Sequence, residues 1–407
     1  MTTFEVEGGR PLRGRLRVPG DKSISHRALL LAARAEGTSV VRGLSGGDDV
    51  LRTRAAVEAM GAIVDGERLT GGVERLHASG HDLDVGNSGT GIRLLAGFCA
   101  PFPWRTTLRG DASVSSRPMD RVAVPLREMG AAVAEAYPPL VIDGGGLQGI
   151  DYTVPMASAQ VKGCVLLAGL GAEGETVVRE LSPTRAHTEE MLAMCGADIS
   201  VDGLVVRLRP STLHPFELDV PGDPSQAAFW VVAACITPGS ELVIENVYLG
   251  PARSGFLDVL RRMGADVTVE GADIVARSSS LHGTDVAASE IPSLDEVPVL
   301  AVAAAAAEGT TTFHDAGELR LKESDRIATV VSELSALGVA AEGEDDTLVV
   351  HGGGLRAGPV RSHGDHRIAM ATAVAGLSVP GTTRVEGWDA VATSYPTFEE
   401  DLRACVS

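Results

Sequence analysis

The sequence predicts an α/β protein made of six copies of one unit, grouped as two sets of three. The first observation is a phrase of the type Met-Gly-Ala, which closes a helix-like segment and recurs about every 70 residues. The second is an Ala- and Leu-rich helix followed by a Gly or Pro turn and a β-branched strand, a pattern that occurs six times. The third is the echo of VPGDKS at 18–23 in VPGDPS at 220–225, which divides the units into two sets.

The Met-Gly-Ala phrase and its variants locate helix ends. Each follows a segment of helical periodicity and precedes an alternating, strand-like segment. Glycine just after a helix supplies the left-handed conformation that closes it. The sequence therefore predicts a helix end followed by a strand at Gly61, Gly130, Gly196, Gly264 and Gly338.

The two Val-Pro-Gly-Asp turns are expected to mark the boundary between two lobes. Units one to three then occupy residues 20–221, and units four to six occupy 1–19 plus 222–407. Residues 1–19 alternate like a strand and complete the second set, whose last unit is short. Two crossings at Pro-Gly turns, near 19–22 and 220–224, predict a hinge and a cleft between the lobes.

Composition narrows the class of function. A length of 407 residues allows two or three cores, and a net charge of −19 argues against a nucleic-acid partner. The apolar run at 297–307 is too short to span a bilayer, and residues 1–18 lack an apolar signal core. We therefore expect no membrane span and a cytoplasmic location. No CxxC pair or metal-ligand spacing is present, so we expect no metal and buried free thiols at Cys99, Cys164, Cys195, Cys235 and Cys405.

Polar and cationic residues open most of the predicted helices, and this is where function is expected. Each motif alone also fits an ordinary structural role: a capped helix with a solvated first turn, a surface arginine, or a salt-bridged face at 320–326. For Gly364 to Met370, the structural alternative is a capping Asp365 with an exposed His366. The motifs are PGDKSISHR at 19–27, GNSGTGIR at 86–93, RPM at 117–119, SAQVK at 158–162, LKESDR at 321–326 and DHRIAM at 365–370.

The position that the cations share in the different units favours a functional role over these structural alternatives. They occupy equivalent positions beside helix starts in different units, so the two lobes can direct them into one cleft. In a protein of charge −19, such convergence implies a multiply anionic ligand, since a phosphate carries about −1.5 to −2 near neutral pH. Asp295 and Glu323 then become acid or base candidates among cations. The cations are Lys22, Arg27, Arg93, Arg117, Lys322, Arg326 and Arg367.

These motifs, in their order and spacing, resemble the 5-enolpyruvylshikimate-3-phosphate synthase family over nearly the whole chain. SAQVKG, TRAHTEEM and GDASVSSRPM are similar to its second, microbial class. The resemblance implies a two-lobed inverse α/β barrel, the enolpyruvyl transferase fold, with three βαβαββ units per lobe, helices inside and sheets outside. It also implies transfer of an enolpyruvyl group from phosphoenolpyruvate to the 5-hydroxyl of shikimate 3-phosphate, with release of phosphate and without a cofactor.

The resemblance also implies residue roles. Asp295 resembles the family's proton acceptor at the 5-hydroxyl, Glu323 the acid that protonates the methylene carbon, and Lys22 is counted with them as catalytic. The residues implied to bind shikimate 3-phosphate are Lys22, Ser23, Arg27, Ser158, Ala159, Gln160, Arg185, Asp295 and Lys322. Those implied to bind phosphoenolpyruvate are Lys22, Gly89, Arg117, Gln160, Arg326 and Arg367.

The chain departs from the pattern of many family members near its C-terminus. Many family members carry a lysine just before the aromatic-Pro pair near the C-terminus, and this chain has ATSYP at 392–396 instead. Gly89 keeps the small residue that admits the inhibitor glyphosate in the family, so we expect glyphosate sensitivity.

Two alternative functions are considered. One is a UDP-N-acetylglucosamine enolpyruvyl transferase, a family that lacks KSISHR and usually carries a reactive cysteine. The other is a catalytically silent metabolite-binding homologue. We expect a monomer.

Overall fold

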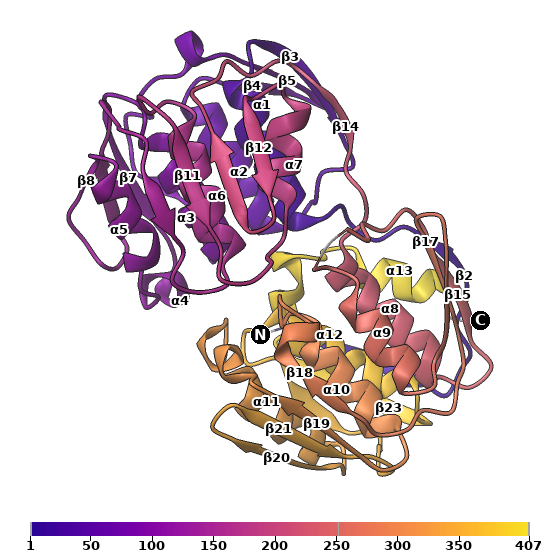
Figure 1. The fold of residues 1–407 in the computed structure, drawn as a ribbon. Helices are drawn as coiled ribbons and strands as arrows, with labels where there is room; N and C mark the ends of the chain where they lie inside the picture. Colours follow the sequence, from indigo (N-terminus) through magenta and orange to yellow (C-terminus); the bar gives the residue numbers. More distant parts are fainter. Residues whose placement is uncertain (1, 251, 406–407) are drawn as a thin grey trace. The chain divides into compact units, whose positions relative to one another are not determined.

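The chain folds as two compact units in the computed structural model, which describes residues 2–250 and 252–405 (Figure 1). One unit is the continuous segment Gly20–Val220, called lobe 1 below. The other, lobe 2, combines Met1–Pro19 with Pro221–Ser407. The chain therefore passes from one unit to the other at Pro19–Gly20 and at Val220–Pro221.

Lobe 1 contains three four-stranded sheets, with the strand orders β14-β3-β5-β4, β6-β7-β9-β8 and β10-β11-β13-β12. Each sheet has one parallel pair, β14 with β3, β6 with β7 or β10 with β11, and its other pairs are antiparallel. The strands are β3 (Gly37–Arg42), β4 (Ile63–Asp65), β5 (Arg68–Gly71), β6 (Leu83–Asp84), β7 (Arg105–Arg109), β8 (Ala132–Val133), β9 (Leu140–Asp143), β10 (Asp151–Thr153), β11 (Thr176–Arg179), β12 (Ile199–Asp202), β13 (Val205–Leu208) and β14 (Glu217–Asp219). The helices are α1 (Lys22–Arg34), α2 (Asp48–Ala59), α3 (Gly89–Cys99), α4 (Ala112–Ser115), α5 (Asp120–Glu128), α6 (Ala159–Gly169), α7 (His187–Met194) and a 3₁₀ turn, η1 (Val73–Arg75).

Lobe 2 contains two four-stranded sheets, β16-β17-β15-β2 and β18-β19-β21-β20, and a three-stranded sheet, β1-β23-β22. The first residues of the chain complete two of them, because β2 pairs with β15 and β1 pairs with β23. The strands are β1 (Thr3–Gly8), β2 (Arg13–Leu16), β15 (Glu241–Ile244), β16 (Asp266–Glu270), β17 (Asp273–Arg277), β18 (Asp285–Ala287), β19 (Thr310–His314), β20 (Ala340–Glu344), β21 (Thr347–His351), β22 (Pro359–Arg361) and β23 (Gly381–Glu386). The helices are α8 (Pro224–Ile236), α9 (Gly255–Arg262), α10 (Val297–Ala306), α11 (Arg326–Ala336), α12 (His366–Leu377) and α13 (Phe398–Cys405), with the 3₁₀ segments η2 (Ala288–Glu290), η3 (Gly317–Leu321) and η4 (Trp388–Thr393).

The predicted six α/β units are confirmed, since the described residues form six sheets, three in each lobe. The glycine that follows the helix in each repeated phrase has a positive φ, from 79° at Gly196 to 109° at Gly130. This is the left-handed conformation expected of a helix-closing glycine. The local repeat in the sequence is therefore a repeat of structure.

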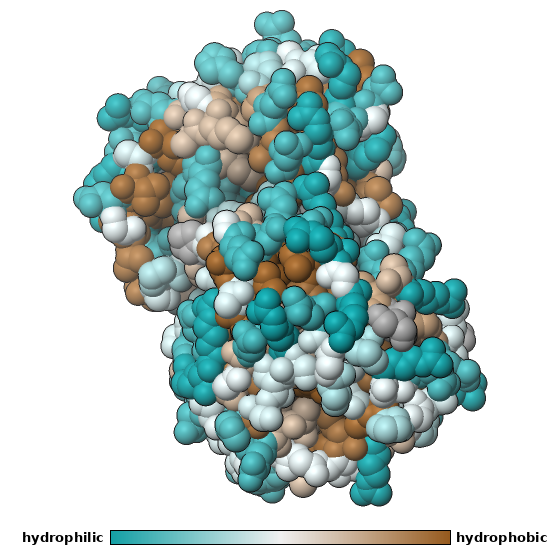
Figure 2. All heavy atoms as spheres, turned by 90° about the vertical axis from the view of Figure 1, so that its right-hand side faces the viewer, coloured by the Kyte–Doolittle hydropathy of each residue, from teal (hydrophilic) through white to brown (hydrophobic). Residues whose placement is uncertain are grey.

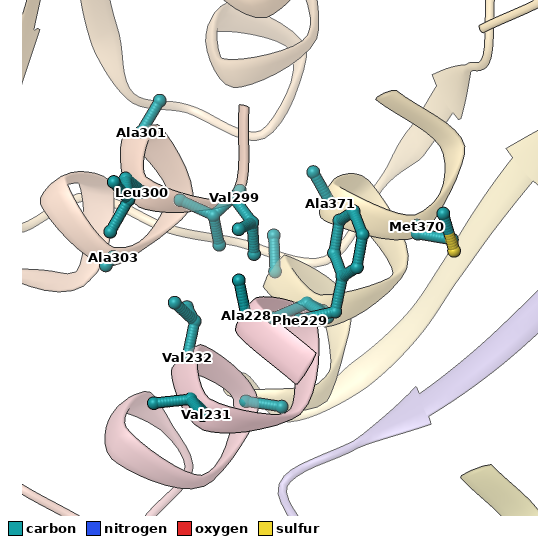
Figure 3. Packing of buried hydrophobic residues seen from close by; sticks show 14 of the residues in the cluster. Ala228, Phe229, Val231, Val232, Val299, Leu300, Ala301, Ala303, Met370 and Ala371 are labelled. Carbon is teal, nitrogen blue, oxygen red and sulfur yellow. The ribbon is translucent and has the colours of Figure 1, made fainter. Parts of the chain in front are cut away.

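The innermost helices form the cores, and they are buried nearly all round. In lobe 2, α8, α10 and α12 pack against one another through small and branched side chains (Figure 3). Helix α10 has the sequence VPVLAVAAAA, without a polar face, as expected for a helix enclosed by protein. Each inner helix also contacts the sheet of its own unit, as α8 does with β15 and α12 with β23. Helices therefore lie inside each lobe and sheets outside.

Hydrophilic side chains cover most of the molecular face drawn in Figure 2, with smaller hydrophobic areas among them. None of the helices within residues 2–250 and 252–405 has the length and apolar composition needed to cross a bilayer. All five cysteines are buried free thiols, which confirms that prediction. Burial raises the pKa of Cys99 and Cys164 to about 12, so both thiols stay protonated and unreactive near neutral pH.

Candidate active site

The helix starts of lobe 1 converge. Helices α1, α3 and α6 are capped by Asp21, Ser88 and Ser158, whose side chains accept backbone N–H bonds. Two residues of α1 reach the other two starts. His26 Nε2 lies 3.5 Å from Ser88 Oγ, and Arg27 Nη2 donates to the carbonyl oxygen of Ala159 at 3.4 Å. Three positively polarised helix ends therefore meet on one side of the lobe.

Cationic side chains gather at this point around Ser23. Arg27 donates to the Ser23 carbonyl oxygen at 3.0 Å and to Thr188 Oγ1 at 2.7 Å, and Arg185 Nη1 donates to Ser23 Oγ at 3.0 Å. Lys22 Nζ lies 3.1 Å from Asp49 Oδ2. Burial, and then the charge of Arg185, lower the pKa of Arg27 to about 10. An anion bound here would relieve this repulsion.

A second group in lobe 1 surrounds the start of α3. Arg117 Nη2 donates to Asn87 Oδ1 at 3.1 Å and to Ser113 Oγ at 3.0 Å. A Cβ at Gly89 would lie 2.9 Å from Arg117 Nη1, so glycine allows this guanidinium to approach the helix start. Arg93 donates to Gln160 Oε1, and Gln160 Nε2 donates to Thr90 Oγ1 at 2.9 Å. The contacts of Gln160 with Arg93 and Thr90 thus join α6 to α3.

In lobe 2 the side chain of Arg326 is the centre of an ion-pair network. Its Nε donates to Asp365 Oδ2 at 2.8 Å, Nη1 to Asp295 Oδ1 at 3.1 Å and Nη2 to Glu323 Oε2 at 2.6 Å. Arg367 Nη2 lies 3.5 Å from the other oxygen of Asp295. Arg326 and Asp365 are both buried, with side-chain exposures of 1% and 0%. Three helix starts, those of α10, α11 and α12, contribute to this network.

The charged groups of this network stabilise one another in their ionised forms. Burial disfavours the charge on Arg326, but the carboxylates of Asp365, Glu323 and Asp295 outweigh burial and raise its pKa above the ordinary value. Burial likewise disfavours the charge on Asp365, yet Arg326 holds the pKa of this carboxyl below its usual range. The buried Arg326–Asp365 pair therefore stays ionised. The carboxyl groups of Asp295 and Glu323 are partly open, at 20% and 17% exposure.

The structure places every residue implied by the motifs at or near a helix start of its own lobe. In lobe 1 these are Lys22, Ser23 and Arg27 in α1, Gly89 in α3, Arg117 before α5, Ser158, Ala159 and Gln160 at the start of α6, and Arg185 before α7. In lobe 2 they are Asp295 before α10, Lys322 and Glu323 between η3 and α11, Arg326 in α11 and Arg367 in α12. Lys322 Nζ donates to the carbonyl oxygen of Ser293 at 3.4 Å.

Two structural alternatives from the sequence are corrected. Asp365 does cap α12, accepting from Arg367 N at 2.9 Å, but His366 is buried at 1% exposure rather than exposed. The segment 320–326 is not uniformly solvated, because Arg326 is buried while Leu321 is 70% exposed. Side-chain pairing across the fold, such as that of Asp365 with Arg326, removes these charges from water.

Sequence reasoning missed a second buried cluster in lobe 2. Arg253 Nη2 donates to Asp223 Oδ1 at 2.8 Å, and Ser225 Oγ donates to Glu296 Oε1 at 2.5 Å. Glu296 also accepts from Ser293 Oγ at 2.5 Å and directly follows Asp295. The VPGDPS echo at 220–225 was the available signal, since Asp223 and Ser225 belong to it. No group of three or more His, Cys, Asp or Glu arranged to hold a metal ion occurs in residues 2–250 and 252–405.

The fold of the chain has a match among solved structures. The enolpyruvyl transferase NikO from Streptomyces tendae has the same fold, with a TM-score of 0.81 at 21% identity over 98% of this chain and 96% of that one. The two lobes of three units are therefore those of the enolpyruvyl transferase fold, as the motifs implied.

The chain belongs to the EPSP synthase (3-phosphoshikimate 1-carboxyvinyltransferase) family, whose model matches residues 6–402. A 3-phosphoshikimate 1-carboxyvinyltransferase from Gloeobacter violaceus is 48% identical over 98% of both chains, and one from Bacillus thuringiensis subsp. konkukian is 46% identical over 96% of both. A solved EPSP synthase from Acinetobacter baumannii aligns with a TM-score of 0.88 at 42% identity, covering 100% of this chain and 98% of that one. The family predicted from the motifs is confirmed.

Proposed function

We propose that the chain transfers the enolpyruvyl group of phosphoenolpyruvate to the 5-hydroxyl of shikimate 3-phosphate, forming 5-enolpyruvylshikimate 3-phosphate and phosphate. The observation that carries the proposal is family membership over residues 6–402 with each implied site residue at a helix start. Both substrates are phosphorylated acids, which suits the cationic side chains gathered at the helix starts of lobe 1. The product belongs to the synthesis of chorismate and the aromatic amino acids.

Lobe 1 supplies mainly substrate-binding groups in this proposal. Shikimate 3-phosphate is held by Lys22, Ser23, Arg27, Ser158, Ala159, Gln160 and Arg185, with Asp295 and Lys322 from lobe 2. Phosphoenolpyruvate is held by Lys22, Gly89, Arg117 and Gln160, with Arg326 and Arg367 from lobe 2. Support comes from the hydrogen bonds that already orient Arg27, Arg117 and Arg185 before any anion binds.

Lobe 2 supplies the groups that move protons. Glu323, as the acid, protonates C3 of phosphoenolpyruvate, so C2 becomes electrophilic. The 5-hydroxyl oxygen then bonds to C2 while its proton passes to Asp295. In the second half of the reaction the C2–O bond to phosphate breaks and the departing phosphate takes up the proton held by Asp295. The new methyl group returns a proton to the Glu323 carboxylate. The enolpyruvyl double bond is restored, and cations stabilise the charge on the departing phosphate.

The ion pair between Glu323 and Arg326 bears on how Glu323 acquires its proton. Glu323 Oε2 accepts from Arg326 Nη2 at 2.6 Å, and a carboxyl paired with a cation resists protonation. We expect the carboxylate of phosphoenolpyruvate to take this guanidinium N–H. Glu323, having lost its cation, then takes up a proton more readily. Arg326 keeps Asp365 through Nε, so it stays in place during the exchange.

The proposal also covers the oligomeric state and the cellular location of the chain. We propose that the chain works as a monomer, which size-exclusion chromatography with light scattering measures directly. We also place it in the cytoplasm, in keeping with five buried free thiols that suit a reducing compartment.

The test is phosphate release from the purified chain mixed with phosphoenolpyruvate and an acceptor. Shikimate 3-phosphate should give stoichiometric phosphate and a product with a new enolpyruvyl ether at O5, identified by NMR. UDP-N-acetylglucosamine, the acceptor of the alternative transferase, should give none. Binding of both substrates without phosphate release would instead identify a silent homologue and end the proposal.

A further inference from the structure

Lysine is rare in this chain and its three positions are distinctive. The 35 basic residues include only three lysines, Lys22, Lys162 and Lys322, and the rest are arginines. Lys22 and Lys322 belong to the groups proposed to bind substrate. The third, Lys162, follows Ser158, Ala159 and Gln160 in α6 but has no role in the proposed reaction, and its side chain is 1% exposed.

The Lys162 ammonium joins two carboxylates from different elements. Nζ lies 2.7 Å from Glu180 Oε2 and 2.6 Å from Glu189 Oε1, and both acids are nearly buried. Glu180 directly follows β11, and Glu189 lies in the first turn of α7. One nitrogen therefore ties together the two ends of the segment 181–186, which connects β11 to α7. We call this arrangement the Lys162 clamp.

The segment held by the clamp begins with exposed residues. Leu181 is 63% exposed, and residues 181–183 are all exposed. Thr184 donates to the second oxygen of Glu180, which extends the clamp into the segment. A segment with so little buried apolar surface is ordered mainly by the polar contacts at its ends.

Two contacts to α1 depend on the position of this segment and of α7. Arg185 Nη1 donates to Ser23 Oγ at 3.0 Å, and Arg27 Nε donates to Thr188 Oγ1 at 2.7 Å. Thr188 directly precedes Glu189, so the clamp lies next to it in the helix. Arg185 lies between the two clamp carboxylates, five positions after Glu180 and four before Glu189. Both contacts to α1 are therefore attached to the clamp by a few residues of chain.

We propose that Lys162 is a positioning residue, which fixes Arg185 and Thr188 against α1 and so shapes the subsite for shikimate 3-phosphate without touching the substrate. This inference rests on the proposed function. A lysine suits the position better than the arginine used elsewhere, because an ammonium is a compact charge whose three N–H groups can serve two converging carboxylates. A planar guanidinium would need more room in a buried space.

The main test uses Glu180→Ala, because replacing Lys162 itself would leave two carboxylates buried without their cation. The remaining Lys162–Glu189 pair is balanced in charge, while the attachment at the β11 end is lost. We expect the KM for shikimate 3-phosphate to rise about tenfold, or about 1.4 kcal/mol, with the KM for phosphoenolpyruvate and kcat unchanged within about twofold. Glu180→Gln, which keeps the side-chain volume, should shift the same KM in the same direction by less.

The matched control is Asp151→Asn, which breaks the exposed ion pair of Asp151 with Arg179, the neighbour of Glu180. It should leave both KM values unchanged. Equal increases in both KM values for Glu180→Ala, or no increase in either Glu180 variant, would overturn the clamp.

A double-mutant cycle separates positioning from general stabilisation. If the clamp acts through Arg185, adding Glu180→Ala to Arg185→Gln should raise the KM for shikimate 3-phosphate by less than about twofold beyond Arg185→Gln alone. Full additivity would contradict the clamp. An unchanged KM for shikimate 3-phosphate in Arg185→Gln would contradict the proposed substrate role of Arg185. This result is distinct from failure of the clamp, because the KM values of the single Glu180 variants test the clamp independently.

Discussion

Arg27 of lobe 1 and Arg326 of lobe 2 are both buried guanidinium groups at helix starts, yet their surroundings are opposite. Arg27 donates its hydrogen bonds to neutral oxygens of Ser23, Thr188 and Ala159, and its pKa is lowered to about 10. Arg326 is paired with three carboxylates, and its pKa is raised. The charge of Arg27 is therefore available to an anion, whereas the charge of Arg326 is neutralised by carboxylates of its own lobe.

This difference gives the two arginines and their neighbours separate roles in the proposed reaction. A buried cation without a paired carboxylate is costly until a ligand supplies the negative charge, so such a cation favours binding. Carboxylates held beside a cation keep their charge and can exchange protons when the cation is taken by a substrate. We therefore expect substitution of Arg27 or Arg185 in lobe 1 to act on substrate affinity, and substitution of Asp295 or Glu323 in lobe 2 to act on turnover.

The largest effect is expected from the carboxylates of lobe 2. Glu323→Gln and Asp295→Ala should each lower kcat by about 10²–10⁴-fold, the range of general acid–base catalysis, with modest changes in KM. Steady-state phosphate release measures this. The control is Glu290→Gln, which breaks a surface ion pair with Arg262 in the same lobe and should leave kcat unchanged. Near-normal turnover of either catalytic variant would remove the division of labour.

The second prediction compares the two arginines through stability. Arg326→Met leaves the buried Asp365 without its cation and should cost about 3–5 kcal/mol of unfolding free energy. Arg27→Met leaves only neutral oxygens unpaired and should cost less, about 1–3 kcal/mol. Urea unfolding of both variants tests this order. Equal losses would mean that the two environments do not differ as described.

The third prediction concerns acid stability and involves His26 of lobe 1. Burial, followed by the charges of Lys22 and Arg27, lowers the pKa of His26 to about 3. The unfolded chain, with an ordinary histidine near 6.5, therefore binds the proton more readily, and the stability due to neutral His26 is lost progressively as pH falls from 6.5 to 3. Between pH 7 and pH 5 this loss should be about 2 kcal/mol.

The pH prediction also distinguishes the lobes. In lobe 2 the lowered pKa of Asp365 contributes stability that is present above about 3.9 and lost only below it. Hydrogen exchange at pH 5 should therefore show opening of α1 around His26 before opening around the Arg326–Asp365 pair. His26→Asn should reduce the loss between pH 7 and pH 5 by more than half. An unchanged loss in that variant would show that other groups cause it.

The smallest effect is expected at Gly89. In Gly89→Ala the new Cβ would lie 2.9 Å from Arg117 Nη1, and this flexible guanidinium end can move aside. The KM for phosphoenolpyruvate should rise by about twofold to fivefold, which is less than 1.4 kcal/mol. We also expect glyphosate to inhibit the natural chain at concentrations near that KM, and the alanine variant less. An inhibition constant far above the KM in the natural chain would contradict the expected sensitivity.

Features encoded over short stretches of chain were predictable. The six units, the glycines after their helices and the capping side chains at 21, 88 and 158 follow from local pattern, because each involves residues within one or two turns. The motifs also predicted the helix starts correctly. The free cysteines were predictable for the same reason, since their apolar neighbours are adjacent in sequence.

Pairings between distant residues were not predictable. Asp365 joins Arg326 across 39 positions, and Arg27 meets Thr188 across 161. No local pattern fixes which charge will be buried with which partner. The sequence therefore predicts the cap at Asp365 correctly, but neither its pairing with Arg326 nor the burial of His366. Lys162 offered a signal, a lone lysine before VLLAGL, but its carboxylate partners lie 18 and 27 positions away on other elements.

The most direct test of the central claim is the reaction run in D₂O and followed by NMR. If Glu323 protonates C3 of phosphoenolpyruvate and a methyl group then loses a proton, deuterium must enter the enolpyruvyl methylene of the product as phosphate is released. We predict deuterated 5-enolpyruvylshikimate 3-phosphate with the natural chain, and about 10²–10⁴-fold less of it in the same time with Glu323→Gln. Product formed at the normal rate with a methylene free of deuterium would contradict the account.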